Sequence, residues 1–256
     1  MLRRAKEQVA TDLPDKIENT VVLPLQPAHR KLYDAVLQRE RKKVLKLLDQ
    51  DLDSNRMTIF RSLTLLRMLA LDPQIVDEDN AAIPSTKLED LLERLEIIVG
   101  AKNHQVIVFS QFTSFLGRVA ERLDGAGISF SYLDGATRDR SDAIKKFREE
   151  GASVFLISLK AGGFGLTLTD ADYVFLLDPW WNPAAEKQAI DRAHRIGQRN
   201  NVMVYRMVSE GTIEEKVLQL QKRKAALFHA LTTGTGTAAA GLTADDLRAL
   251  FDTHCA

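Results

Sequence analysis

Length, composition and charge limit this chain to one large globular domain, or to one domain with an appended helical part. It has 256 residues, of which 45% are hydrophobic and 27% are charged, and this balance excludes a disordered chain. No apolar run approaches the roughly 20 residues that span a bilayer, so we expect no membrane partner. Lysine plus arginine equals aspartate plus glutamate at 35 each, so any contact with nucleic acid must come from local patches.

The single cysteine, Cys255, and the spacing of His104 and His194 exclude a disulfide framework and predict no metal site in this chain. The opening residues lack the apolar core of a signal peptide. We therefore expect a reducing, intracellular compartment, which would be the cytoplasm (nucleoid) of a bacterium or otherwise the nucleus.

The first third of the chain predicts a connector, a helical hairpin and a linker. Residues 1–26 have a basic start and an extended piece, which indicates a connector. Residues 27–74 contain two helical patterns, at 27–49 and 56–71, and 75–86 is a linker by composition. One side of the first helix is basic. Such a charge run is usually a solvated face, although it also suits DNA.

From residue 87 the pattern changes to helices alternating with short apolar strands, which predicts a doubly wound α/β domain over residues 87–209. The expected helices are 87–99, 113–123, 141–147 and 183–195, and the expected strands are 105–109, 129–133, 153–158, 173–177 and 202–208. One more helix is expected within 210–232. Residues 233–256 predict a flexible spacer and a last short helix, opened by a capping box at Thr243 and Asp246.

Three unusual loops follow predicted strands, at the edge where open parallel sheets bind ligands. The first contains Ser110 and Gln111. The second runs from Ser158 to Thr167 with several glycines, and the third leads from Asp178 into the helix at 183. The glycines permit close approach to a phosphate, but they match neither a Walker A loop nor a dinucleotide fingerprint. A tight structural crossover is the alternative interpretation.

The helix predicted at 183–195 carries two arginines. Pro183 suits its first position and Gly197 its stop. Four residues form a narrow apolar stripe, whereas three others share a different face: the stripe is Ala185, Ala189, Ala193 and Ile196, and the polar face is Gln188, Arg192 and Arg195. Paired guanidiniums on a rigid element suit a polyanion. The alternative is a solvated face with ion pairs to Glu186 and Asp191.

Several runs resemble the second RecA-like lobe of the SNF (Swi/Snf-like) family of helicase-related, DNA-dependent ATPases. They are residues 105–116, LDGAT at 133–137, residues 158–168 and above all DPWWNPAAEKQAIDRAHRIGQ at 178–198. The resemblance implies a RecA-like doubly wound parallel sheet, with an N-terminal helical hairpin protrusion and a C-terminal brace helix. The ATP-binding loop and the DExH box of the family belong to its first lobe.

The resemblance also implies roles for individual residues. Arg192 and Arg195 would be arginine fingers, with Gln188 beside them as a third catalytic residue. The positions near the nucleotide are Gly163, Gly165, Thr167 and Asp191, and those near the DNA backbone are Ser110, Gln111, Ser158, Lys160, Gly162 and Trp181. Thr167 stands where the family more often has asparagine.

The preferred functional hypothesis is the C-terminal motor lobe of an ATP-dependent translocase or remodeller of double-stranded DNA. The cofactor would be ATP with Mg²⁺, bound mainly by a first lobe, and this chain alone would be inactive. Its partners would be duplex DNA, the first lobe and a DNA-bound protein such as a polymerase or histones. Two alternatives are a non-catalytic module that binds DNA or protein and a Rossmann-like small-molecule enzyme, which lacks its fingerprint.

Overall fold

The computed structural model describes residues 13–50, 52–159, 167–180, 183–232 and 243–252, and the side chains at 52, 53 and 224–232 are not among those described. Contacts divide the chain into two compact units. The first comprises Met1–Val21, Asp90–Asp178 and Ala184–Met207, and the second comprises Val22–Glu89, Pro179–Pro183 and Val208–Ala256.

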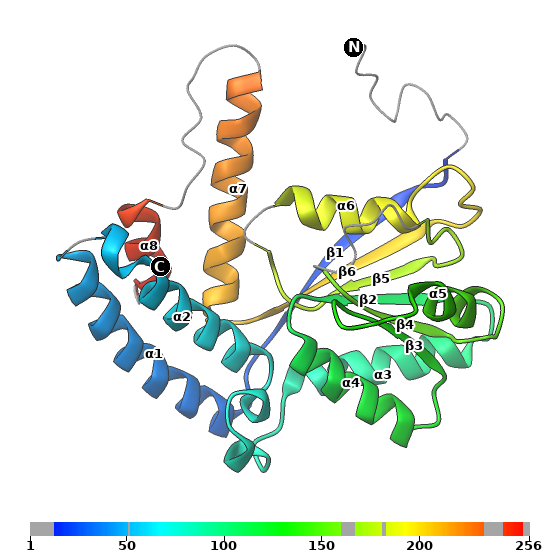
Figure 1. Cartoon of the computed structure of the whole chain (residues 1–256), viewed down its shortest axis with the longest axis horizontal. Coiled ribbons are helices and arrows are strands. Elements are labelled where there is room, and N and C mark those ends of the chain that lie inside the picture. Colours follow the sequence, from blue (N-terminus) through cyan, green and yellow to red (C-terminus); the bar gives the residue numbers. More distant parts are fainter. Residues whose placement is uncertain (1–12, 51, 160–166, 181–182, 233–242, 253–256) are drawn as a thin grey trace. The chain divides into compact units, whose positions relative to one another are not determined.

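The first unit is built on a parallel sheet (Figure 1). Its strands are β1 (Lys16–Leu23), β2 (Val106–Ser110), β3 (Phe130–Leu133), β4 (Val154–Ser158), β5 (Tyr173–Leu176) and β6 (Val202–Ser209). They lie in the order β1-β6-β5-β2-β4-β3. The central strands β2 (VIVFS) and β4 (VFLIS) are buried along their whole length, which explains why both are almost continuously apolar.

Helices cover both faces of this sheet. They are α3 (Thr86–Gly100), α4 (Thr113–Gly125), α5 (Arg140–Arg148) and α6 (Pro183–Ala193). Figure 1 shows α3 and α4 on one face and α6 on the other. One core cluster joins Phe147 of α5 and Ile190 of α6 to alternate strand residues such as Ile107 and Ile157. The doubly wound α/β prediction is therefore confirmed.

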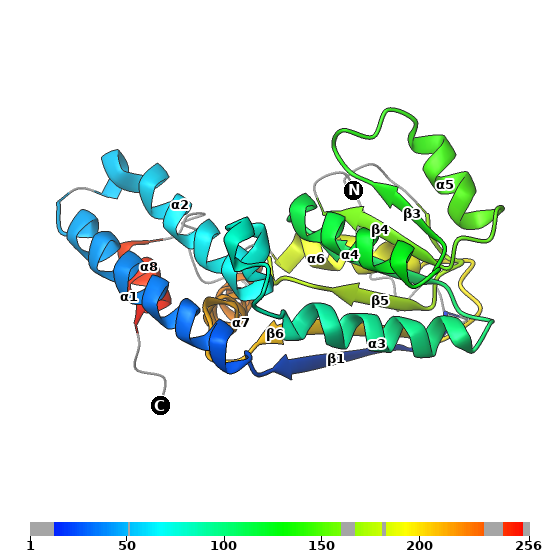
Figure 2. The ribbon, with the colours of Figure 1, turned by 90° about the horizontal axis from the view of Figure 1, so that it is seen from below.

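The strand β1 was not predicted as part of the sheet, because residues 1–26 indicated only an extended connector. In the structure it runs parallel to β6 at one edge (Figure 2). The amide of Val202 donates to the carbonyl of Asp15 at 2.9 Å, and the amide of Glu210 donates to the carbonyl of Leu23 at 2.8 Å. An edge strand has one solvated side, so its mixed polar sequence lacks the apolar run that marks β2 and β4.

The second unit is helical. Its elements are α1 (Pro27–Leu48), α2 (Leu52–Leu71), two short 3₁₀ helices η2 (Pro73–Ile75) and η3 (Glu78–Asn80), α7 (Ile213–Thr232) and α8 (Ala244–Phe251). Figure 2 shows α1 and α2 side by side as a hairpin. Their core contains Tyr33 of α1, Leu66 of α2, Val217 of α7 and Phe251 of α8. In the described part of the chain, every helix is too short or too polar to traverse a lipid bilayer.

Candidate functional site

Three strand ends meet at the carboxyl edge of the sheet, as the sequence predicted. In the sheet β5, β2 and β4 are neighbours, with Ser110 level with Ser158 and Phe109 level with Leu176. The chain leaves β2 through α4 toward β3, whereas it leaves β5 through α6 toward β6 on the opposite side. Adjacent strands whose connections diverge form the crevice where sheets of this type bind ligands. The topology therefore favours a ligand site between the ends of β2 and β5.

A buried carboxyl group, that of Asp178, joins these two strand ends. Its side chain accepts from the hydroxyl of Ser110 at 2.5 Å and from the backbone amide of Gln111 at 3.1 Å. The same hydroxyl accepts from the amide of Phe112 at 3.0 Å, at the start of α4. Asp178 is 1% exposed. The loop after β2 is consequently tied to the end of β5.

Two residues expected to face DNA are buried in this arrangement. Ser110 and Ser158 are both inaccessible to solvent, and the hydroxyl of Ser110 is used by Asp178. Of the residues named for this loop, only Gln111 is partly exposed. Ser110 therefore positions the loop after β2, and neither serine offers its side chain to a phosphate in this geometry.

The helix α6 begins at Pro183, as predicted, but it ends at Ala193 and not at residue 195. Ala189 and Ala193 are buried on the sheet, where small side chains let a helix approach closely. The stripe does not extend to Ile196, which is 73% exposed. This part of the prediction was wrong, because the chain leaves the helix in a turn in which the amide of Arg195 donates to the carbonyl of Ala193 at 3.2 Å.

Gln198 holds the end of that turn in place, a role that was not predicted from the sequence. Its amide nitrogen donates to the carbonyls of Ala171 at 2.8 Å and Ala193 at 3.2 Å. Its side-chain oxygen accepts from the amides of Arg199 at 2.8 Å and Asn200 at 3.0 Å. The preceding Gly197 has φ +106°, a conformation that favours glycine. A polar side chain directly after a glycine that ends a helix was the feature of the sequence from which this role could have been predicted.

The two arginines differ in their surroundings. Arg192 is 9% exposed; its Nε donates to the carbonyl of Gln188 at 3.3 Å, and its buried Nη1 has no hydrogen-bond partner. Burial lowers the pKa of Arg192 from its ordinary value. Arg195 is exposed beyond the helix end, where its Nη1 donates to the hydroxyl of Thr167 at 3.5 Å. Within the described residues, neither guanidinium is ion-paired.

Those findings correct two expectations. The arginines do not share one helical face, because Arg195 lies outside α6. The alternative of a solvated face with incidental ion pairs does not fit Glu186 either, since Glu186 is buried and binds Arg206 at 3.1 Å. Gln188 is exposed and Asp191 is half-buried on α6.

The loop after β4 is tied to the arginine turn where the structure describes it. The amide of Leu168 donates to the carbonyl of Arg192 at 2.9 Å. Arg148 of α5 donates to the carbonyl of Thr167 and pairs with Asp170 at 3.0 Å. The remaining predicted residues lie outside the described residues, and these are Lys160, Gly162, Gly163, Gly165 and Trp181.

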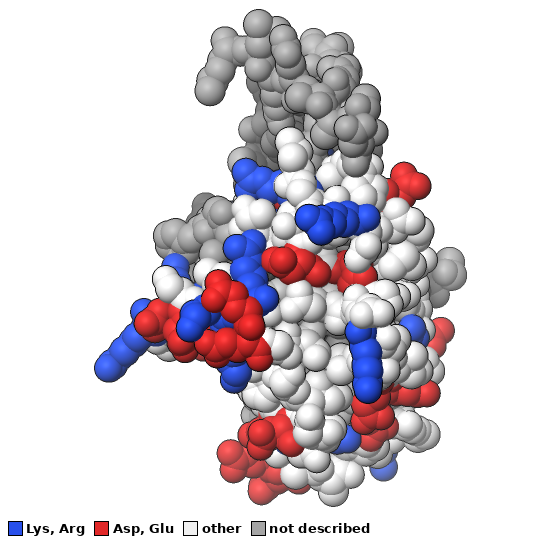
Figure 3. Space-filling model, turned by 90° about the vertical axis from the view of Figure 1, so that its right-hand side faces the viewer, with Lys and Arg blue, Asp and Glu red and all other residues white. Residues whose placement is uncertain are grey.

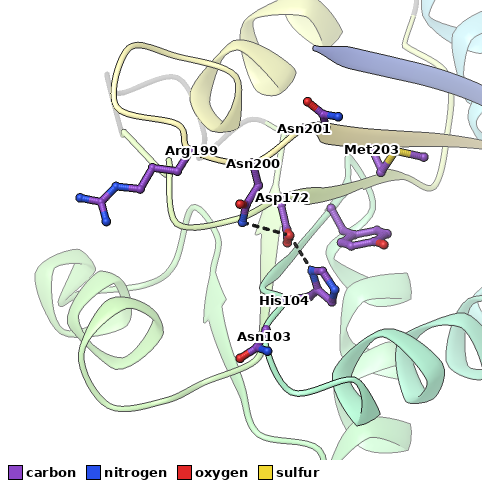
Figure 4. A pocket seen from close by; sticks show the side chains of 8 residues that line it. Asn103, His104, Asp172, Arg199, Asn200, Asn201 and Met203 are labelled. Atoms are coloured by element: carbon purple, nitrogen blue, oxygen red, sulfur yellow. Dashed lines mark hydrogen bonds and ion pairs between the residues drawn. The ribbon is translucent and has the colours of Figure 1, made fainter. Parts of the chain in front are cut away.

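A hollow of about 560 Å³ lies at the opposite, amino edge of the sheet. Figure 4 shows His104 and Asn200 both turned toward Asp172. The Nδ1 of His104 is 2.6 Å from the carboxylate of Asp172, and the amide of Asn200 is 3.5 Å from it. These contacts join the loops before β2, β5 and β6. Of the predicted site residues that the structure describes, none lines this hollow.

Charged side chains of both signs are mixed on the surface of the molecule that Figure 3 shows. Figure 3 shows one side of the molecule, on which lysines and arginines alternate with acids and leave uncharged surface between them. On the described residues, no three histidine, cysteine, aspartate or glutamate side chains gather as metal ligands.

Comparison with known proteins identifies the family. Residues 86–197 match the helicase conserved C-terminal domain, and residues 1–75 match the SNF2-related domain. The chain is 35% identical over 255 residues to an uncharacterized ATP-dependent helicase of Mycoplasma pneumoniae, which covers 98% of this chain and 24% of that protein. It is 42% identical over 171 residues to the ATP-dependent helicase rhp16 of Schizosaccharomyces pombe, which covers 66% of this chain and 20% of that protein. The chain thus spans about a quarter or less of these curated relatives.

Solved structures agree. The Sulfolobus solfataricus SWI2/SNF2 ATPase core in complex with dsDNA is 29% identical with a TM-score of 0.65, covering 91% of this chain and 50% of that one. The C-terminal domain of the same ATPase is 25% identical with a TM-score of 0.65, covering 94% of this chain and 100% of that one. This chain therefore belongs to the SNF2-related helicases, and its α/β part is the second RecA-like lobe of that family.

Proposed function

We propose that this chain is the C-terminal motor lobe of an ATP-dependent translocase of double-stranded DNA. The observation that carries the proposal is the state of the two arginines. A buried guanidinium nitrogen without a partner is costly, and it persists at Arg192 beside an exposed Arg195 that has no carboxylate partner among the described residues. Two guanidiniums without carboxylate partners are able to stabilise negative charge on the phosphates of a nucleotide that another lobe binds.

The donor set fits a polyphosphate. Guanidiniums carry a permanent charge and a planar fork of donors matched to phosphate oxygens. When bound to a first lobe, ATP with Mg²⁺ would supply the free energy for movement. Arg195 would neutralise negative charge on the terminal phosphate. Arg192, which is more buried than Arg195, would do the same from a less solvated position. Gln188, Asp191 and Thr167 would line the same side of the nucleotide.

The loop containing Gln111 would hold the DNA backbone, with Ser110 and Ser158 positioning the strand ends behind it. Lys160, Gly162 and Trp181, which lie outside the described residues, are proposed for the same role, and Gly163 and Gly165 for the nucleotide side. The complex of the Sulfolobus solfataricus SWI2/SNF2 ATPase core with dsDNA supports this partner. Such a motor would work where DNA is, in a nucleoid or a nucleus, and its target would be a DNA-bound protein such as a polymerase or histones.

The test compares the chain alone with the chain joined to an SNF2-family first lobe. The chain alone should not turn over ATP, and the joined protein should show DNA-stimulated hydrolysis. Arg195→Ala in the joined protein should lower kcat by about 10³-fold or more, the size of an arginine-finger effect. The control is Arg199→Ala, an exposed arginine beyond the Gln198 turn, which should leave kcat nearly unchanged.

Near-normal turnover by the Arg195→Ala protein would refute the motor assignment. DNA binding without any ATPase in the joined protein would instead favour a non-catalytic DNA- or protein-binding module.

A further inference from the structure

Helix α1 has one face packed into the second unit and one face that the described residues of that unit leave exposed. Tyr33, Val44 and Leu48 are buried against α2, α7 and α8. The opposite side carries five exposed cations, which we call the basic face: Lys31, Arg39, Lys42, Lys43 and Lys46. With 3.6 residues per turn, Lys31, Lys42 and Lys46 fall within about 60° of one another around the helix axis.

The local charge is strongly positive although the whole chain is neutral. Residues 27–71 hold ten lysines and arginines against five aspartates and glutamates, an excess of five positive charges. Two of those acids, Asp34 and Asp49, are already paired, with Arg30 at 3.7 Å and with Arg248 at 3.0 Å. Neither of these two acids is paired with a residue of the basic face.

Glu40, the acid at the middle of α1, is withdrawn from the surface. It is 4% exposed and accepts from the hydroxyl of Ser62 on α2 at 2.7 Å. Burial alone would raise the pKa of Glu40, but Ser62, Arg39 and Lys43 together lower it. The carboxylate anchors Arg39 at 3.0 Å and Lys43 at 3.4 Å. Among the described residues, Lys31, Lys42 and Lys46 have no ion-pair partner.

The dimensions suit a regular polyanion. Lys31 and Lys46 are separated by fifteen residues, which is about 22 Å along a helix at about 1.5 Å per residue. Phosphates on one strand of duplex DNA advance about 3.4 Å along the axis per base pair, so this length corresponds to roughly six base pairs. Among the described residues of α1, no large apolar side chain is exposed. An acidic peptide would need such anchors, so the phosphate backbone is the better match.

We propose that the basic face of α1 is a second contact for the phosphate backbone of duplex DNA, made by residues other than those at the carboxyl edge of the sheet. The inference rests on the proposed function, in which the chain acts on DNA. The contact carries no base readout, because lysine heads on a helix surface meet phosphates as point charges. It adds affinity that falls steeply with salt.

The experiment measures binding of this 256-residue chain to a duplex of random sequence over a range of NaCl concentrations. Each phosphate neutralised contributes about 0.9 to the slope of log Kobs against log[salt]. The variant Lys31→Gln, Lys42→Gln, Lys46→Gln should reduce the steepness of that slope by about 2 to 3 and weaken binding at low salt. The same three positions changed to arginine should restore the slope.

The matched control removes three exposed lysines elsewhere, as Lys102→Gln, Lys145→Gln, Lys222→Gln. It makes the same change in net charge and should alter the slope by less than about 0.5. Equal effects of the two triple variants would overturn the proposal, since the loss would then reflect net charge alone. An unchanged slope in the α1 variant would also overturn the proposal. So would binding of polyglutamate, in place of DNA, to the basic face of α1. The ATPase result for Arg195 is independent of these outcomes, so the two proposals fail separately.

Discussion

Arg192 is placed at a cost that packing alone does not explain. The residue is 9% exposed and its Nη1 has no partner, whereas Arg206 in the same unit is held by Glu186 at 3.1 Å and by Glu18 at 3.7 Å. A group whose charge is desolvated without compensation weakens the free fold, and it is retained where a ligand completes it. The proposed function accounts for this contrast, because it gives Arg192 a nucleotide phosphate as its missing partner, whereas Arg206 already has its partners within the fold.

Replacing each arginine by methionine tests this difference. Arg192→Met should leave the free energy of unfolding unchanged or raise it by up to about 1 kcal/mol, because it removes an uncompensated buried charge. Arg206→Met should lower it by about 2 kcal/mol, because buried Glu186 loses this partner. Urea unfolding of the chain gives both values. A loss at Arg192 as large as that at Arg206 would mean that Arg192 is structural.

Gln198 provides a second residue-scale prediction. Its side chain makes four hydrogen bonds to the backbone while buried. Gln198→Ala should therefore cost about 2 kcal/mol of stability. Gln188→Ala, at an exposed position on α6, should cost less than about 0.5 kcal/mol. Equal midpoints of denaturant unfolding for the two variants would contradict the role assigned to Gln198.

For individual residues, the sequence indicated which loops lie close together, but not which side-chain atoms are available to bind a ligand. The placement of Gln111 at the carboxyl end of β2 followed from the βα alternation, because loops after parallel strands share one edge, whereas Thr167 lies beside Arg148 at the end of α5 and a few residues before β5. The burial of Ser110 did not follow, since it depends on Asp178, which lies 68 residues away. Contacts of that kind are set by sheet order, which no local pattern encodes.

Among the elements, helix starts were better predicted than strand membership or helix ends. Thr243 and Asp246 form the expected capping box, with the Thr243 hydroxyl accepting from the amide of Asp246 and the Asp246 carboxylate accepting from the amide of Thr243. A cap is a local arrangement of four residues and is therefore readable. The end of α6 and the entry of β1 into the sheet depend on distant partners, so they were missed.

The cap of α8 can be tested by itself. Thr243→Ala should lower the free energy of unfolding by about 1 kcal/mol, because the amide at Asp246 loses its acceptor. Thr243→Ser should keep most of that stability. The comparison variant is Thr64→Ala in the interior of α2, where no helix terminus is affected and no comparable loss is expected. Thermal denaturation of the three variants measures the difference.

On the scale of the whole molecule, each of the two compact units has its own core cluster. In the helical unit a buried histidine joins two elements, since Nε2 of His29 on α1 is 2.6 Å from the carbonyl of Leu69 on α2. Burial lowers the pKa of His29 below its ordinary value of 6.5, and the hydrogen bond to Leu69 opposes that shift only in part. Just below pH 6.5, His29 therefore binds a proton more readily in the unfolded chain than in the folded chain.

The sign of the pH effect follows. The stability due to neutral His29 is complete above about pH 6.5 and is lost as the pH falls from there toward the lower pKa of the folded state. His29→Gln keeps an amide donor but cannot titrate. Between pH 7.5 and 5.5, urea unfolding should show a larger loss of stability for the natural chain than for this variant. Parallel pH profiles would exclude His29 as the titrating group.

The carboxyl group of Asp178 has a consequence for the path of a nucleic acid. Sheets of this topology usually receive anions in the notch between diverging strands, yet here the notch is plugged by an acid that already engages Ser110 and Gln111. A duplex bound as proposed would therefore run past Asp178 without touching it, and Asp178 would act on the contact only through Gln111, whose backbone amide it holds.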